Sequence, residues 1–384
     1  MQSNQKIIKA RRTYNKLVAN EMMEDFALRF TAKRARKWSL NRISMTALGI
    51  VSFLVLEAIG GAITLQYGFE NAAWAILAVT LIVFLTGLPI SYYAAKYGVD
   101  IDLLSRGAGF GYIGSSIASL IYASFTFIFF ALEAAIMAMA LNILFALPLP
   151  IGYIVSTLLI IPLVTHGITY ISRFQVWTSP IWVALQLLPL FFVFTHSDTQ
   201  LSEWMSFTGE AGESGKSFNL LLFGGASAVL LALVAQIGEQ VDFLRFLPEK
   251  PQKDAWRWWI ALIAGGPGWM IFGALKLFLG SFLAYFALKQ GVAPHLASDP
   301  AHMYQLAYSY VFDNPSISVF VACTFVVLSQ LKINVANAYA GSLAWSNFFS
   351  RVTHNHPGRV VWMVFNVAIA LLLMELGIYQ TINR

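Results

Sequence analysis

Three polar residues lie inside one apolar stretch, and their types suggest a site for a small polar molecule. Lys332, Asn334 and Asn337 fall within 316–346, which is long enough to cross a bilayer. A charge at the bilayer centre costs about 2.5–3.5 kcal/mol, so we expect Lys332 to face a protein interior or cavity and to have a partner. The two asparagines share one helix face. Their amides could bind a flat heterocycle, or they could form hydrogen bonds between helices.

Two acidic residues in other apolar segments are the expected partners of Lys332. Glu57 and Glu133 both lie well inside their segments, and an ion pair is the cheapest way to keep such charges buried. We therefore predict a charge-coupling group of Glu57, Glu133 and Lys332. It is either a structural salt bridge or a device that handles substrate or protons. Lys276 is expected instead to pack, or to extend its ammonium group toward the membrane surface.

Glycine pairs interrupt two of the apolar segments. They are Gly60 and Gly61 in the first segment, and Gly224 and Gly225 in the sixth. Glycine pairs weaken a helix, which at membrane depth is tolerated where the backbone lines a cavity or packs on protein. The two pairs occupy corresponding positions if the fold has two five-helix halves, and such interruptions indicate a midplane binding site. At Gly265-Gly266-Pro267 we expect close helix packing instead.

Composition places the chain in a lipid bilayer. Of its 384 residues, 58% are hydrophobic and 11% are charged, against roughly 25% charged residues in a soluble domain. A span takes about 20 apolar residues. Nine segments qualify: 43–67, 72–95, 113–145, 149–166, 176–196, 218–241, 259–287, 316–346 and 360–378. We predict an all-α polytopic membrane protein whose transmembrane domain covers 43–384.

Basic residues predict the orientation. The segment 1–42 contains 11 of the 25 Lys and Arg residues, and such residues collect on the cytoplasmic side of membrane proteins. We therefore expect a cytoplasmic basic leader over 1–42 and a multi-pass protein of the inner (plasma) membrane. Because the positive charge is concentrated in a tail, nucleic acid is not an expected partner.

Signatures of catalysis or metal binding are weak. His295 and His302 lie seven residues apart without a cysteine or carboxylate at a ligand spacing, so no metal site is expected. The single cysteine, Cys323, lies in an apolar segment and cannot form an intramolecular disulfide. We expect a protein that is not an enzyme and carries no cofactor.

Four stretches resemble cytosine-permease-like members of the nucleobase-cation symporter family. They are 332–351, like the family's eighth helix, 240–246, like the inner end of helix six, 24–30, like the segment before helix one, and 106–111, like the entry to helix three. The resemblance implies a five-plus-five inverted-repeat, leucine-transporter-like fold. It also implies import of purines, pyrimidines, hydantoins or related compounds with sodium or protons.

The resemblance implies particular site residues as well. In that family the ligand lies between an aromatic and a polar residue of helix three, the broken helices one and six, and an asparagine of helix eight. Carried onto this sequence, the positions are Phe129, Glu133, Gly60, Gly61, Gly224, Gly225, and Asn334 or Asn337.

Three departures from the family pattern matter. Lys332 lies where sodium-coupled members offer small hydroxyl residues to the ion. Its ammonium could replace the cation, so we expect sodium-independent behaviour and leave a coupling proton open. Leu231-Ala-Leu233 takes the place of an expected helix-six tryptophan. Nine spans against about twelve predict a permease that is incomplete at its C-terminus.

Two alternatives to a nucleobase transporter remain. The chain is also similar to permease-like sensory domains of some bacterial hybrid histidine kinases, which would add downstream signalling domains as partners. The third alternative is an inactive truncated permease.

Overall fold

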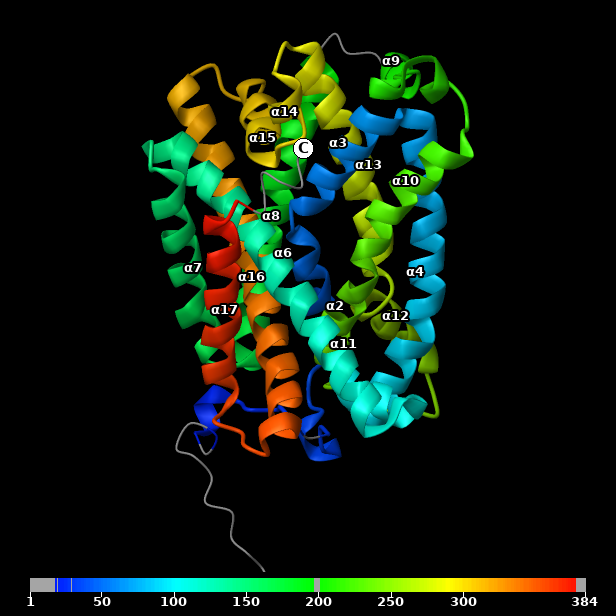
Figure 1. The fold of residues 1–384 in the computed structure, drawn as a ribbon, viewed down its shortest axis with the longest axis vertical. Coiled ribbons are helices and arrows are strands. Elements are labelled where there is room, and N and C mark those ends of the chain that lie inside the picture. The colour runs from blue at the N-terminus through cyan, green and yellow to red at the C-terminus, as the bar shows by residue number, and fades with distance from the viewer. Residues whose placement is uncertain (1–17, 19, 29, 197–200, 378–384) are drawn as a thin grey trace, which may run out of the picture.

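The apolar segments are helical in the structure, a computed structural model (Figure 1). It describes residues 18, 20–28, 30–196 and 201–377. Residues 1–17 of the predicted leader, and 378–384 at the end of the last predicted span, lie outside the described residues. The described part of the chain contains helices and turns without strands. Helices suit a chain in lipid because each satisfies its own backbone hydrogen bonds.

The helices follow the chain in the order that Figure 1 labels them. The longer ones are α2 (Leu40–Gly49), α3 (Val55–Tyr67), α4 (Phe69–Tyr97), α6 (Gly111–Phe145), α7 (Leu149–Thr165), α8 (Ile168–His196), α10 (Leu220–Leu231), α11 (Ile237–Leu244), α12 (Ala255–Gly265), α13 (Trp269–Lys289), α15 (Pro300–Ser309), α16 (Pro315–Thr353) and α17 (Arg359–Glu375). Shorter helices are η3 (Ile50–Ser52), α5 (Ile101–Ser105), α9 (Leu201–Met205), η6 (Ala232–Gln236) and α14 (Pro294–Ala297).

Six helical stretches of the described residues are long and apolar enough to cross a membrane, and a bent pair supplies a seventh. The bent pair joins Leu40–Ser52 to Val55–Tyr67 at 47°. Helices α7 and α17, which coincide with two further predicted spans, have 17 residues each. They run alongside the other helices (Figure 1). For these two segments the nine-span expectation stays a prediction.

A side-chain cap sets where the longest helix begins. Asn314 Oδ1 accepts hydrogen bonds from the backbone N–H of Ser316 at 2.9 Å and of Ile317 at 3.4 Å, and Pro315 occupies the first helical position. An asparagine cap followed by proline is a strong helix start because it satisfies N–H groups that have no partner within the helix. The resulting α16 is one unbroken helix of 39 residues, so its polar residues keep a fixed angular spacing.

The helix breaks do not fall at the glycine pairs. In the first span the helix stops at Phe53, whose backbone is extended (φ −61°, ψ 132°), and restarts at Val55. In the sixth span α10 runs through Gly224 and Gly225 and changes to the tighter helix η6 at Ala232. The prediction that the glycine pairs mark the breaks was therefore wrong by about two turns in both spans.

Close packing explains the first glycine pair. A Cβ atom placed on Gly60 would come within 2.0 Å of the Leu277 carbonyl oxygen, and one on Gly280 within 2.1 Å of the Glu57 carbonyl oxygen. Helices α3 and α13 thus touch backbone to backbone, as small residues allow in membranes. A Cβ atom on Gly225 would lie 3.0 Å from the ring of Tyr67, whereas one on Gly224 would meet no described atom of another helix within 4 Å.

The third glycine-rich stretch breaks its helix, where packing alone was expected. Helix α12 ends at Gly265, and α13 begins at Trp269. A Cβ atom on Gly266 would lie 2.5 Å from the Ser91 hydroxyl, so this stretch packs closely as well.

Helices α6 and α16 form the centre of the bundle. Helix α6 crosses it obliquely beside α16, and α17 packs against both (Figure 1). Helices α14 and α15 lie at one end of the bundle, opposite the described N-terminal residues 20–39. The polar residues of α16 therefore face α6 and α8 at mid-depth.

Candidate functional site

The break in the first span exposes backbone groups that buried side chains satisfy. The carbonyl oxygen of Ser52 accepts a hydrogen bond from the Lys276 ammonium at 3.0 Å, and the N–H of Leu54 donates to the Gln330 amide oxygen at 3.4 Å. The Ser52 hydroxyl donates to the Ser329 carbonyl at 3.1 Å. Helices α13 and α16 therefore both hold the break, which lies at the centre of the bundle.

Glu57, on the first turn of α3, pairs with Lys276. One carboxylate oxygen lies 3.2 Å from the Lys276 ammonium and also accepts a hydrogen bond from the Tyr304 hydroxyl at 3.1 Å. Gln186 of α8 donates in turn to the same hydroxyl. Glu57 is fully buried and Lys276 nearly so. The expectation that Lys276 only packs or snorkels was wrong, because the contact between α3 and α13 places it against Glu57.

Lys332 has neutral partners in place of the predicted carboxylates. Its ammonium donates to three oxygens of α8, the Thr178 hydroxyl at 3.0 Å, the Ser179 hydroxyl at 3.1 Å and the Gln175 carbonyl at 3.3 Å. The Gln175 amide donates back to the Lys332 carbonyl. Among the described residues no carboxylate pairs with it. The predicted group of Glu57, Glu133 and Lys332 is therefore divided, because Lys332 points to α8 while Glu57 lies against α13.

Glu133 is a fully buried carboxylate on α6 that has no hydrogen bond of ordinary geometry to a described residue, although the Gln330 amide and the Val55 backbone act on it as more distant hydrogen-bond donors. Its electrostatic neighbours are the Gln330 amide, Lys276, Glu57 and the backbone of Val55 at the start of α3. A buried carboxylate without hydrogen bonds is costly, since it can accept from several donors at once. Glu133 is thus an unused acceptor aimed at the break in the first span.

The two asparagines of α16 form a short chain toward α6. The Asn334 amide nitrogen donates to the Phe130 carbonyl at 3.4 Å, and the Asn337 amide nitrogen donates to the Asn334 oxygen at 3.1 Å. The Asn337 oxygen has no partner among the described residues. Asn334 therefore forms a hydrogen bond between helices, which was one of the two roles expected for the asparagines. The Asn337 oxygen remains able to accept a hydrogen bond from a ligand.

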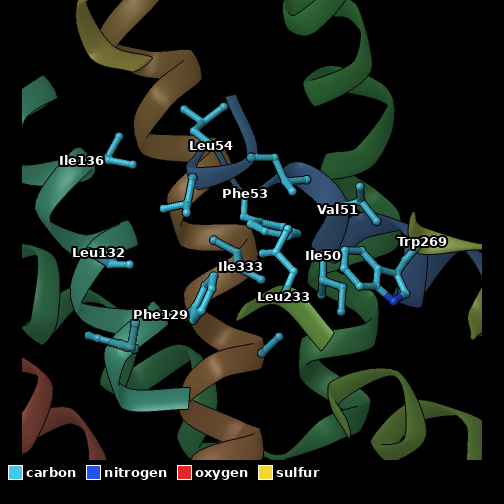
Figure 2. Close-up of a cluster of buried hydrophobic side chains, with 14 of the residues drawn as sticks. Ile50, Val51, Phe53, Leu54, Phe129, Leu132, Ile136, Leu233, Trp269 and Ile333 are labelled. Atoms are coloured by element: carbon cyan, nitrogen blue, oxygen red, sulfur yellow. The ribbon is translucent and has the colours of Figure 1, made fainter. Parts of the chain in front are cut away.

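An apolar cluster lies beside these polar groups. Figure 2 shows Phe129 of α6 together with Phe53 from the break, Ile333 of α16 and Leu233 of η6. Phe129 is 7% exposed, and its ring centre lies 4.4 Å from that of Phe125. Leu233 stands where the family resemblance led us to look for a tryptophan, so the aromatic rings of this cluster come from other positions, Phe53, Phe129 and Trp269.

Glutamines are the residues that sequence reasoning missed. The Gln330 amide nitrogen and both polar atoms of Gln240 are buried without a hydrogen bond to a described residue. Gln236 donates to Glu239 at 2.6 Å, and the other Glu239 oxygen has no partner. The available signal was the run of three polar side chains, at 236, 239 and 240, inside an apolar segment.

The inner part of the N-terminal segment closes one end of the bundle. Asp25 accepts hydrogen bonds from the ring of His356 at 2.9 Å and from the N–H of Arg359 at 3.0 Å. Arg245, in the stretch that resembles the family's helix-six motif, donates to the Thr31 hydroxyl at 2.9 Å and lies 3.4 Å from Asp100. Burial alone would raise the pKa of Asp25, but the His356 and backbone hydrogen bonds lower it below its usual value.

Together, these features define a class of protein. A helical membrane bundle whose first span is broken, whose sixth span changes to a tighter helix, and which buries polar groups at the first break has the five-plus-five inverted-repeat, leucine-transporter-like fold.

Comparison with solved structures supports this class. Mhp1, a nucleobase-cation-symport-1 family transporter in a closed conformation with bromovinylhydantoin bound, matches with a TM-score of 0.69 and 18% identity, over 94% of this chain and 75% of that one. The inward-facing conformation of Mhp1 matches with a TM-score of 0.61 and 19% identity, over 89% of this chain and 72% of that one. A Na⁺-coupled sialic acid symporter in a substrate-bound outward-open state matches with a TM-score of 0.61 and 14% identity, over 96% of this chain and 78% of that one. These likenesses show the fold of the chain.

Sequence comparison finds nothing further. No family model matches the chain, and no curated protein matches it.

Proposed function

We propose that this membrane protein is a secondary active transporter, and not an enzyme, that moves a small heterocycle of the nucleobase or hydantoin type by alternating access. The fold supports transport, since the structures it resembles include transporters with small molecules bound. The observation that carries the proposal is the fully buried Glu133 carboxylate, which has no hydrogen bond of ordinary geometry to a described residue and lies near Val55 at the break in the first span.

The ligand's hydrogen-bonding pattern follows from the unused groups. The Glu133 oxygens and the Asn337 oxygen are acceptors, and the Gln330 amide nitrogen is a donor. A flat ring that presents N–H groups to Glu133 and a carbonyl to Gln330 satisfies these atoms. Phe129 (Figure 2), four residues before Glu133 on α6 and therefore on the same helix face, offers an apolar ring for stacking. Cytosine and related amino-substituted heterocycles fit this pattern better than rings that carry only acceptors.

Coupling to sodium is not expected. The Lys332 ammonium already holds three oxygens at 3.0–3.3 Å, which is how a bound cation would be held. Glu133 is the better candidate for coupling, because a buried carboxylate gains or loses a proton readily when a donor ligand arrives.

The test is ligand binding to the purified chain in detergent. Radiolabelled cytosine and a panel of purines and hydantoins are measured with the native chain and with Glu133→Ala, Asn334→Ala and Asn337→Ala. We expect Glu133→Ala to weaken binding at least tenfold and Asn337→Ala several-fold. Because Asn334 bonds to α6, its effect should be smaller and partly structural.

Ser124→Ala is the matched control. Ser124 lies on the same helix as Glu133, and its hydroxyl bonds only within that helix, to Leu120. It should leave affinity unchanged. Unchanged affinity in all three site variants would remove the proposed site, and binding that rises steeply with sodium would refute the role given to Lys332.

A further inference from the structure

A groove runs between α2 and α8 at the end of the bundle that carries the N-terminal segment. It is a cavity of about 380 Å³. Its polar half is lined by Ser39, Asn41, Arg42 and Arg173, and its apolar half by Met45, Val176 and Trp177. It lies apart from the central site, on the outer side of the two helices.

The polar half carries two positive charges that form no ion pair with a carboxylate of the described residues. Arg42 is held in place by the Ser172 hydroxyl at 2.8 Å, the Thr169 carbonyl at 3.3 Å and the ring of Trp38, 4.2 Å below its guanidinium. Its Nη1 has no hydrogen bond to a described residue. Arg173 is exposed and lies close enough to Arg42 for the two charges to repel each other.

The nearby acidic residue Glu24 offsets the positive charge only in part, because the repulsion of Arg42 by Arg173 is larger than its attraction to Glu24. Glu24 attracts Arg42 electrostatically, but its carboxylate accepts the backbone N–H of Thr169 at 2.7 Å. Within the described residues no carboxylate forms an ion pair with Arg42 or Arg173. Two neighbouring guanidinium groups without an ion pair to a described carboxylate are an arrangement that a phosphate would complete.

The apolar half continues the groove by one helical turn. Met45 follows Arg42 by three residues, and Trp177 follows Arg173 by four, so each lies on the same face as its arginine. The side chain of Trp177 is 79% exposed, and that of Met45 is 39% exposed. Both helices belong to membrane spans, and tryptophan beside arginine at a helix end is typical of the membrane–water interface.

We infer that the groove between α2 and α8 binds an anionic membrane phospholipid. Arg42 and Arg173 would hold the phosphate of the headgroup, while Met45, Val176 and Trp177 would contact the first part of an acyl chain. Basic pockets between spans at the cytoplasmic side are a recognised way to bind anionic lipid headgroups. The lipid would bridge α2, the first half of the broken span, to α8.

The experiment measures lipid binding by the full chain after delipidation in neutral detergent. Native mass spectrometry follows the uptake of phosphatidylglycerol and, separately, of phosphatidylcholine. We expect the native chain to prefer phosphatidylglycerol. Arg173→Gln should lower that affinity about fivefold, since one basic residue near a surface contributes about 1 kcal/mol, and should leave phosphatidylcholine binding unchanged. Arg173→Lys keeps the charge and should retain most of the preference.

A second groove supplies the control. It lies between α2 and α12 and contains a single arginine, Arg257, beside Trp256. Arg257→Gln should leave the preference intact. An unchanged preference in Arg173→Gln, or an equal loss in Arg257→Gln, would overturn the inference. Stabilisation of the native chain by inorganic phosphate as strong as that by phosphatidylglycerol would also overturn it, because the site would then bind a free anion only.

Discussion

Two buried lysines are held in opposite ways. Lys276 on α13 forms an ion pair with Glu57 at 3.2 Å, whereas Lys332 on α16 is surrounded by two hydroxyls and a carbonyl of α8. Both lie beside the break in the first span, Lys276 through the Ser52 carbonyl and Lys332 through its neighbour Gln330. One lysine thus neutralises a charge, and the other occupies a cage of neutral oxygens.

The two lysines should differ in what their removal costs. A buried ion pair depends on both members, since the loss of either leaves an uncompensated charge. A lysine among neutral oxygens leaves only dipoles behind when it is removed. Glu133, which forms no ion pair and no hydrogen bond of ordinary geometry with a described residue, is the third case. We propose that this carboxylate is the one that meets a ligand or a proton.

The largest expected effect comes from breaking the ion pair. Lys276→Met should lower the free energy of unfolding by about 3–5 kcal/mol, because it strands the Glu57 carboxylate in the bundle. The thermal unfolding midpoint in detergent, followed by tryptophan fluorescence, measures this.

The double variant Glu57→Gln with Lys276→Met is the control, because it also removes the Glu57 charge. It should recover a large part of the loss, since no buried charge remains. If the double variant is as unstable as Lys276→Met alone, the pair is not what stabilises this region.

Replacing the other lysine should cost less. Lys332→Met should lower the free energy of unfolding by about 1–2 kcal/mol. Thr178 and Ser179 keep hydrogen bonds of 2.6 Å to carbonyls of their own helix, so neither hydroxyl is stranded. The same thermal measurement applies. A loss equal to that of Lys276→Met would mean that an uncompensated charge does face Lys332, and the contrast would fail.

Glu133→Gln should separate binding from stability. It replaces an unpaired buried carboxylate with a neutral group of the same shape, so we expect stability to be unchanged or to rise by about 1 kcal/mol. Ligand affinity should nevertheless fall. Thermal unfolding and ligand titration are measured on one preparation, and a large loss of stability would show that Glu133 has a structural partner.

The smallest expected effect is a pH dependence of the local stability of α15, at the end of the bundle opposite the N-terminal segment. Asp299 caps α15 and hydrogen-bonds the ring of His302, which raises the pKa of His302 above its usual 6.5. A raised pKa contributes stability that is present below pH 6.5 and is lost as the pH rises through the folded value. Because α15 also carries Tyr304, which reaches Glu57, this change should loosen the cover over the ion pair.

Hydrogen exchange of the first turn of α15 measures this change. After correction for intrinsic rates, protection should fall between pH 6 and pH 8 in the native chain. His302→Gln should remove the dependence. A native chain whose corrected protection does not change with pH would contradict the assignment.

The local sequence pattern was enough to predict the helices and to identify the buried charged residues. Apolar length predicted the membrane spans, and the cost of a charge in lipid marked Glu57, Glu133 and Lys332 as interior residues, as the structure confirms. The asparagines were placed on one face, and their hydrogen bond confirms that geometry. Their role in binding stays a prediction.

The partners of the buried charges and the positions of the helix breaks could not be predicted from the local sequence. Glycine pairs looked like breaks, but Gly60 is the contact that brings α3 against α13, while Phe53 and Leu54, without any glycine, form the bend. Helix α13 then presents Lys276 to groups that lie far away in the sequence, since it is 224 positions from Ser52. No local rule ranks Lys276 above Lys332 as the partner of Glu57.

By itself, the sequence determined that this is a helical membrane protein with several charges in its interior, because hydropathy and the cost of burial act residue by residue. Only the tertiary structure decided which charges neutralise each other and which remains available. That choice depends on which helices touch and at what angle, and a helix contact joins residues that no spacing along the chain relates.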